Sequence, residues 1–274
     1  MLNSHDPNVE YTLKNKVFTL KINRPSKKNA LLPQMYRSLA TGLSLADSME
    51  EATVILITGM DDCFTSGNDV NGFITATESK ESSEDQPSKA LMHALNETQK
   101  PIVAAISGLA IGIGTTLLLH CDLIYASENC FLQLPFTRLG LCPEAGSSFL
   151  LPRQIGHQRA SELLLLGDRI SAKKAYEYGL VNEVLPQSDY LEYARQKAYQ
   201  LAALPSKSVQ TSKRLLKKNS IAESRAVINE ELVEFAALLE TPEAQRIVQS
   251  FIDSSAARKS GCRIQAIPFS KGPL

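Results

Sequence analysis

Alternation of apolar and polar residues marks the first elements of the chain. Val9 to Leu13 and Val17 to Ile22 alternate on either side of Asn15, which is the pattern of a β-hairpin. From Pro33 to Met49 the apolar period becomes helical. The continuous apolar run that follows, over residues 54–58, predicts a buried strand that ends at a glycine.

The order of strand, glycine-bearing turn and helix then recurs. Ile102 to Ile106 predicts a second buried strand, Ile113 to His120 a helix, and Leu123 to Ala126 another strand. Repeated crossovers of this kind indicate an α/β fold with parallel strands. Residues 75–89 are mostly polar and cannot bury a core, so we expect a mobile loop there.

Strand patterns disappear after about Tyr190, and the rest of the chain is helical in period. The apolar stripes of these helices need to pack on the core or on another subunit, so we expect an oligomer. From Ser254 the sequence is polar and contains proline, which predicts a loose end. We expect a core over residues 1–200 and a helical C-terminal region with a tail over 201–274. The four expected helices are Tyr190–Leu204, Lys207–Lys218, Ile221–Leu239 and Pro242–Ile252.

Composition narrows the class of protein. Twenty-nine basic and 29 acidic residues give a formal charge of zero, which argues against nucleic acid or an anionic membrane as the main partner. Five cysteines without Cys-x-x-Cys spacing are typical of free thiols in a reducing compartment. The N-terminus lacks the pattern of a secretory signal, no apolar run has the length of a membrane span, and Lys271 to Leu274 is not a Ser-Lys-Leu-type peroxisomal ending. We therefore expect a cytoplasmic protein, with a peroxisomal location as the alternative.

Two glycine-bearing turns, Phe64–Asp69 and Ser107–Gly114, each follow an apolar strand pattern and each precede an expected helix. Amides at the start of a helix have no partner within it and attract negative charge. Two such amides aimed at one carbonyl oxygen form an oxyanion hole. The glycine spacing does not match a nucleotide-binding loop. A single turn of this kind usually serves packing, but two in the same context favour an oxyanion hole.

Glu144 is the candidate acid or base. A glutamate in a loop is usually a solvated charge, but the neighbours of Glu144, from Leu139 to Leu151, are mainly apolar or small. Desolvation there predicts a raised pKa, which suits proton transfer near neutral pH. His120 lies beside Cys121, but no third ligand has suitable spacing, so we expect a packing role and no metal site.

Together these segments resemble the crotonase (enoyl-CoA hydratase/isomerase) superfamily from about Val9 to Asp253. Each motif is weak alone, but their common order is specific. The matching pieces are Asn23-Arg24-Pro25, Asn29-Ala30-Leu31, Phe64-Thr65-Ser66-Gly67-Asn68-Asp69, Gly108-Leu109-Ala110-Ile111-Gly112, Cys121-Asp122 and Leu139-Gly140.

The resemblance implies a spiral core of ββα repeats and a C-terminal region that forms a homotrimer or a dimer of trimers. It implies that the backbone amides of Asn68 and Ile113 hold the thioester oxygen of an acyl-CoA, and that Asp69 caps a following helix. No further cofactor is implied, because CoA is part of the substrate. The residues expected to line the substrate are Ser66, Gly67, Asn68, Asp69, Val70, Gly112 and Ile113.

The positions of the carboxylates distinguish activities within the superfamily. Hydratases similar to this chain carry two glutamates where this sequence has Thr116 and Phe136. Glu144 instead resembles the catalytic glutamate of peroxisomal-type Δ3,Δ2-enoyl-CoA isomerases, which implies a 1,3-proton shift in 3-enoyl-CoA. Phe136 would keep such a pocket dry. Two alternatives stay open, namely another crotonase-type reaction on an acyl-CoA, such as hydration, and a non-catalytic acyl-CoA-binding relative.

Overall fold

The structure is a computed structural model that describes Ser4 and residues 6–69 and 86–259, with side chains up to residue 253. A six-stranded sheet forms its centre, in the order β1-β2-β3-β5-β7-β10. β1 and β2 form the expected antiparallel hairpin, and the other neighbouring strands in this sheet are parallel. The strands are β1 Val9–Lys14, β2 Val17–Ile22, β3 Val54–Thr58, β5 Ile102–Ile106, β7 Leu123–Ser127 and β10 Glu183–Leu185.

A second sheet has four short strands in the order β4-β6-β8-β9. β4, β6 and β8 are parallel, and β9 is antiparallel to β8. The pairs β3–β4, β5–β6 and β7–β8 each supply one strand to the large sheet and the next to the small sheet. Helical segments lead from one pair to the next, so the expected α/β fold of ββα repeats is confirmed. The small strands are β4 Cys63–Thr65, β6 Leu109–Ile111, β8 Phe131–Gln133 and β9 Ile170–Ser171.

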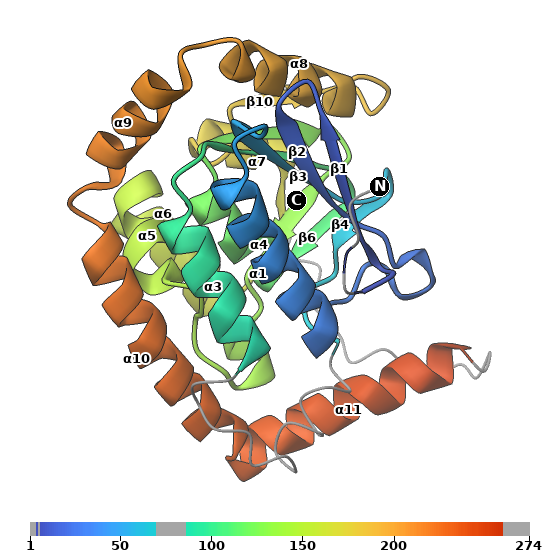
Figure 1. The fold of residues 1–274 in the computed structure, drawn as a ribbon. Coiled ribbons are helices and arrows are strands. Elements are labelled where there is room, and N and C mark those ends of the chain that lie inside the picture. Colours follow the sequence, from blue (N-terminus) through green and yellow to red (C-terminus); the bar gives the residue numbers. More distant parts are fainter. Residues whose placement is uncertain (1–3, 5, 70–85, 260–274) are drawn as a thin grey trace.

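Helices cover both faces of the large sheet (Figure 1). Ile55 and Ile57 of β3 belong to the main core with Leu39 of α1 and Leu95 of α3. The alternate side chains, such as Leu56, pack against α8. Because both faces are buried, the central strands have continuous apolar sequences. The helices named here are α1 Pro33–Ser48, α3 Pro87–Glu97 and α8 Tyr190–Ala202.

Short helical segments connect the strands. The expected helix from Ile113 to His120 is divided into an α-helical turn and a 3₁₀ turn. These segments are η1 Pro25–Lys27, α4 Ile113–Thr116, η2 Leu117–His120, η3 Thr137–Leu139, α5 Ser147–Ile155, α6 His157–Ser161, η4 Glu162–Leu166 and α7 Ala172–Glu177.

The C-terminal helices form an arc around the core (Figure 1). They are α9 Ser206–Lys217, α10 Ile221–Leu239 and α11 Pro242–Lys259, and α10 packs on α3 and α5. Leu216 and Val233 remain 87% and 68% exposed. Among the described residues, no helix is long and apolar enough to cross a membrane.

Two expectations about irregular segments need correction. The expected loop over residues 75–89 is wrong for Pro87 to Lys89, which form the first turn of α3, where proline at the start of a helix is favourable. Its earlier part lies outside the described residues. The expected loose end from Ser254 is also wrong up to Lys259, because α11 continues to that residue. Residues 256–259 are two alanines, an arginine and a lysine, which are all good helix formers.

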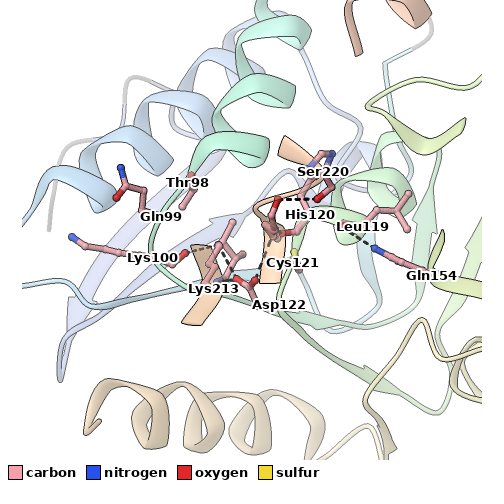
Figure 2. A network of polar contacts seen from close by, with 12 residues as sticks. Thr98, Gln99, Lys100, Leu119, His120, Cys121, Asp122, Gln154, Lys213 and Ser220 are labelled. Carbon is pink, nitrogen blue, oxygen red and sulfur yellow. Dashed lines mark hydrogen bonds and ion pairs between the residues drawn. The ribbon is translucent and has the colours of Figure 1, made fainter. Parts of the chain in front are cut away.

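A buried polar cluster ties α9 to the ends of β5 and β7 (Figure 2). Lys213 is 6% exposed, and its Nζ lies 2.8 Å from Asp122 Oδ2 and donates to the carbonyl oxygen of Lys100 at 2.7 Å. Asp122 Oδ2 also accepts from the Ile102 amide at 2.7 Å. Lys217 of α9 donates to the carbonyl oxygen of His120 at 2.6 Å. The helical C-terminal region is thus hydrogen-bonded to the core beside η2.

Candidate active site

The first glycine turn is held against residues 29–31. Leu31 donates to the carbonyl oxygen of Gly67 at 2.8 Å and accepts from the amide of Asp69 at 3.0 Å. Successive amides of an extended segment point to opposite sides, so the amide of Asn68 points away from Leu31. It makes no hydrogen bond within the part of the chain that the structure describes.

The second turn presents an amide in a similar way. Gly112 has a φ of +57°, donates to the carbonyl oxygen of Gln133 at 2.9 Å and precedes the first residue of α4, Ile113. An amide at this position has no acceptor inside the helix. The Ile113 amide has none elsewhere among residues 6–69 and 86–259.

Close backbone packing brings the two turns together. They contain most of β4 and all of β6, which are parallel neighbours. A β-carbon on Gly67 would lie 2.7 Å from the carbonyl oxygen of Ile111, and one on Gly114 would lie 2.6 Å from the side chain of Thr65. Only glycine permits this approach, and Gly67 also has a φ of +89°.

Glu144 lies beside the second turn. Its side chain is buried, and Oε1 accepts a hydrogen bond from Thr116 Oγ1 at 2.5 Å. Thr116 lies three residues after Ile113 on the same short helix, so the carboxyl group is near the helix start that carries the free amide. Burial raises the pKa of Glu144 to about 8, the negative charge of Glu231 adds to the rise, and the Thr116 hydrogen bond opposes it. Such a carboxyl group can both accept and return a proton near neutral pH.

Tyr36 is hydrogen-bonded to the first turn and lies within the electrostatic influence of Glu144. Its hydroxyl donates to Asn68 Oδ1 at 2.6 Å, and its side chain is 3% exposed. Burial raises the pKa of Tyr36 well above its usual value, and the nearby charge of Glu144 contributes to the rise. The sequence analysis missed this residue because Tyr36 continues the apolar stripe of its helix. The only sequence signal was a hydroxyl group at a position where the helix otherwise has apolar side chains.

The other residues expected to line the substrate lie in the two turns or outside the described residues. Asp69 forms an ion pair with Arg24 at 2.8 Å, and the helix that it was expected to cap lies outside the described residues, as does Val70. Ser66 and Gly112 are partly exposed in the two turns. The full set of expected lining residues that the structure describes, Ser66, Gly67, Asn68, Asp69, Gly112 and Ile113, therefore lies within the two turns.

His120 and Phe136 are both buried, and His120 contacts the residue after Glu144. His120 Nε2 donates to the carbonyl oxygen of Ala145 at 2.8 Å, and burial lowers the pKa of His120 to about 4, which keeps the ring neutral. Phe136 is part of the main core. Within the described residues, no group of three or more His, Cys, Asp or Glu side chains is arranged to hold a metal ion.

Comparisons with known proteins find a matching family model and similar enzymes that act on acyl-CoA compounds. The family model for enoyl-CoA hydratase/isomerase matches residues 12–258. Enoyl-CoA delta isomerase 2 of Rattus norvegicus is 37% identical over 235 residues, which are 84% of this chain and 59% of that protein. The 2,3-dehydroadipyl-CoA hydratase of Escherichia coli strain K12 is 32% identical over 237 residues, 86% of this chain and 92% of that protein.

A solved structure, that of Pseudomonas aeruginosa OdaA, superimposes with a TM-score of 0.86 at 43% identity. The match covers 90% of this chain and 99% of that one. This chain thus spans nearly the whole of one solved relative but only about three fifths of the rat protein.

Proposed function

The chain belongs to the enoyl-CoA hydratase/isomerase family, and we propose that within it the chain is a Δ3,Δ2-enoyl-CoA isomerase. The observation that carries the proposal is the buried carboxyl group of Glu144 beside two glycine turns, whose Asn68 and Ile113 amides have no partner among the described residues. Thr116 and Phe136 occupy the positions where hydratases similar to this chain carry glutamates. The rat relative named as a delta isomerase supports the same activity.

In the proposed reaction, the thioester oxygen of a 3-enoyl-CoA accepts hydrogen bonds from the amides of Asn68 and Ile113. The Glu144 carboxylate removes a proton from C2, and the negative charge that develops on the thioester oxygen is stabilised by both amides. The protonated Glu144 then donates that proton to C4. The C2–H bond breaks, a C4–H bond forms, and the double bond moves from C3–C4 to C2–C3. CoA enters as part of the substrate, and no other cofactor takes part.

The reaction should depend on pH through Glu144. The base must be deprotonated, and the pKa of Glu144 is about 8, so kcat/KM should be low below this pH and rise as pH increases through it. A profile of kcat/KM against pH reports this group in the free enzyme. A profile that is flat across pH 8 would contradict the assignment of Glu144 as the base.

Hydration is the second candidate activity, because the E. coli relative is named as a hydratase. The assay that separates the two follows trans-3-hexenoyl-CoA and crotonyl-CoA in parallel. Isomerisation of the first substrate with negligible hydration of the second supports the proposal. Hydration at a comparable or greater rate would favour a hydratase, and turnover of neither substrate would favour another acyl-CoA reaction or a binding role.

We also propose that the C-terminal helices form contacts between subunits of a homotrimer or a dimer of trimers. Leu215 and Leu216 of α9, Val233 of α10 and Phe251 of α11 are between 41% and 87% exposed. Large exposed apolar residues on adjoining helices are typical of protein interfaces. A monomeric mass in sedimentation equilibrium would contradict this assembly.

A further inference from the structure

The turn that carries Glu144 has an uncommon backbone. Ala145 has a φ of +59° and Gly146 a φ of +72°, so two successive residues adopt the left-handed conformation. For a residue with a side chain, such as Ala145, this conformation persists only where the surroundings fix it. The contacts around the turn therefore decide where the Glu144 carboxyl group lies.

His120 holds one side of the turn through the carbonyl oxygen of Ala145. His120 is itself fixed, because its own carbonyl oxygen accepts from Lys217 beside the polar cluster of Asp122 and Lys213 (Figure 2). The ring is neutral and the acceptor is a carbonyl oxygen, so the proton lies on Nε2.

Glu231 of α10 holds the other side. Its Oε2 accepts from the Gly146 amide at 2.6 Å, and its Oε1 accepts from the Ser148 amide at 2.9 Å and from Ser148 Oγ at 2.6 Å. Glu231 is 7% exposed, and its carboxyl group lies at the start of α5, where unpaired amides favour a negative charge. α10 also packs closely here, since a β-carbon on Gly146 would lie 3.0 Å from Ser224 Oγ.

We propose that Glu231 is a positioning residue for Glu144. It fixes the turn over residues 144–148 from the side opposite His120 and keeps a negative charge close to the catalytic carboxyl group. This inference rests on the proposed function only for its kinetic consequences. Through Glu231, the C-terminal helical region helps to arrange the site, in addition to any role in subunit contacts.

Several titratable groups surround this pair and need to be kept constant in a test. Burial raises the pKa of Glu231, whereas its three hydrogen bonds favour the charged form and lower it. The charge of Glu231 in turn raises the pKa of Glu144. Glu144 raises the pKa of Tyr36 on α1, Glu231 and Glu144 both raise the pKa of Cys142 in the same loop, and Glu230 on α10 raises the pKa of Glu231. Glu234 on α10 acts on Cys142, and His120 on η2 contacts the turn.

The kinetic test compares Glu231→Gln with Glu223→Gln, which changes the same residue type at an exposed position of the same helix, α10. We expect Glu231→Gln to lower kcat by about 10-fold or more with little change in KM, because a misplaced general base affects the chemical step. Glu223→Gln should behave as wild type. Ser148→Ala, which removes one of the three donors, should give a smaller fall in kcat and serves if Glu231→Gln does not fold.

A second readout does not need turnover. Difference infrared spectra between each protein and its Glu144→Gln counterpart isolate the protonated carboxyl band of Glu144 and follow its titration. Removing the neighbouring negative charge favours ionised Glu144, so in Glu231→Gln the titration should move to lower pH, by roughly half a pH unit or more. Wild-type kcat together with an unshifted Glu144 titration in Glu231→Gln would overturn the proposal. A shifted titration in a protein that does not isomerise 3-enoyl-CoA would support the role of Glu231 and contradict the proposed function.

Discussion

Replacing Glu144 with glutamine should lower the rate of isomerisation by about 10³-fold, a typical contribution of a general acid–base group. Glutamine has nearly the same shape, and its amide oxygen can still accept from Thr116, which now donates to Glu144 at 2.5 Å. What it lacks is the ability to take a proton from C2. The loss should therefore appear in kcat, with KM little changed.

The measurement follows the absorbance of the 2-enoyl thioester formed from trans-3-hexenoyl-CoA by wild type, Glu144→Gln and Glu223→Gln. Glu223 is exposed on α10, so its substitution controls for loss of one negative charge elsewhere. Thermal unfolding of each variant checks that the fold is intact. If Glu144→Gln keeps more than a tenth of the wild-type rate, Glu144 is not the proton carrier.

Gly67→Ala should remove most activity by a different route. The new β-carbon would lie 2.7 Å from the Ile111 carbonyl oxygen, and a residue with a side chain strains at the Gly67 φ of +89°. The first turn must then move away from the second and carry the Asn68 amide with it. Loss of one oxyanion donor typically costs about 10²–10³-fold in kcat, so we expect a fall of about 10²-fold or more.

Gly156→Ala is the matched control for Gly67→Ala. Gly156 has a similar φ of +84°, but no atom lies within 4 Å of its added β-carbon, and it joins α5 to α6 away from the two turns. Both variants should lose stability from the backbone conformation, measured as a lower Tm. Only Gly67→Ala should lose most of its kcat/KM. If kcat/KM is the same for Gly67→Ala and Gly156→Ala, the close approach of the two turns does not matter for activity.

The sequence predicted the long elements well because each has a clear period. The hairpin, the buried strands β3, β5 and β7 and the helices α1, α8, α9 and α10 lie within a few residues of their expected positions, whereas β10 was not expected. The small sheet was missed. β4 and β6 have only three residues each and, apart from Cys63, lie inside the glycine turns. So short a strand has no measurable alternation of apolar and polar residues.

At the site, sequence motifs pointed to Glu144 and the two turns, but not to the side chains that contact them. Tyr36 has the spacing of a core residue, Thr116 is a small polar residue in a helix, and Glu231 is one of several glutamates on α10. Their partners lie far away in the sequence, so only tertiary packing reveals them. The contact between Glu231 and α5 also crosses the boundary expected near residue 200, and the division into two regions stays a prediction.

The most direct test of the account follows the proton itself. 3-Hexenoyl-CoA deuterated at C2 is converted in ordinary water to low extent, and the deuterium at C4 of the product is measured by mass spectrometry. Because Glu144 is only 6% exposed, the proton that it removes should exchange slowly with water. A single carboxyl group that takes the deuteron from C2 and returns it to C4 predicts deuterium at C4 in part of the product. Product that carries only solvent hydrogen at C4 would contradict transfer through Glu144.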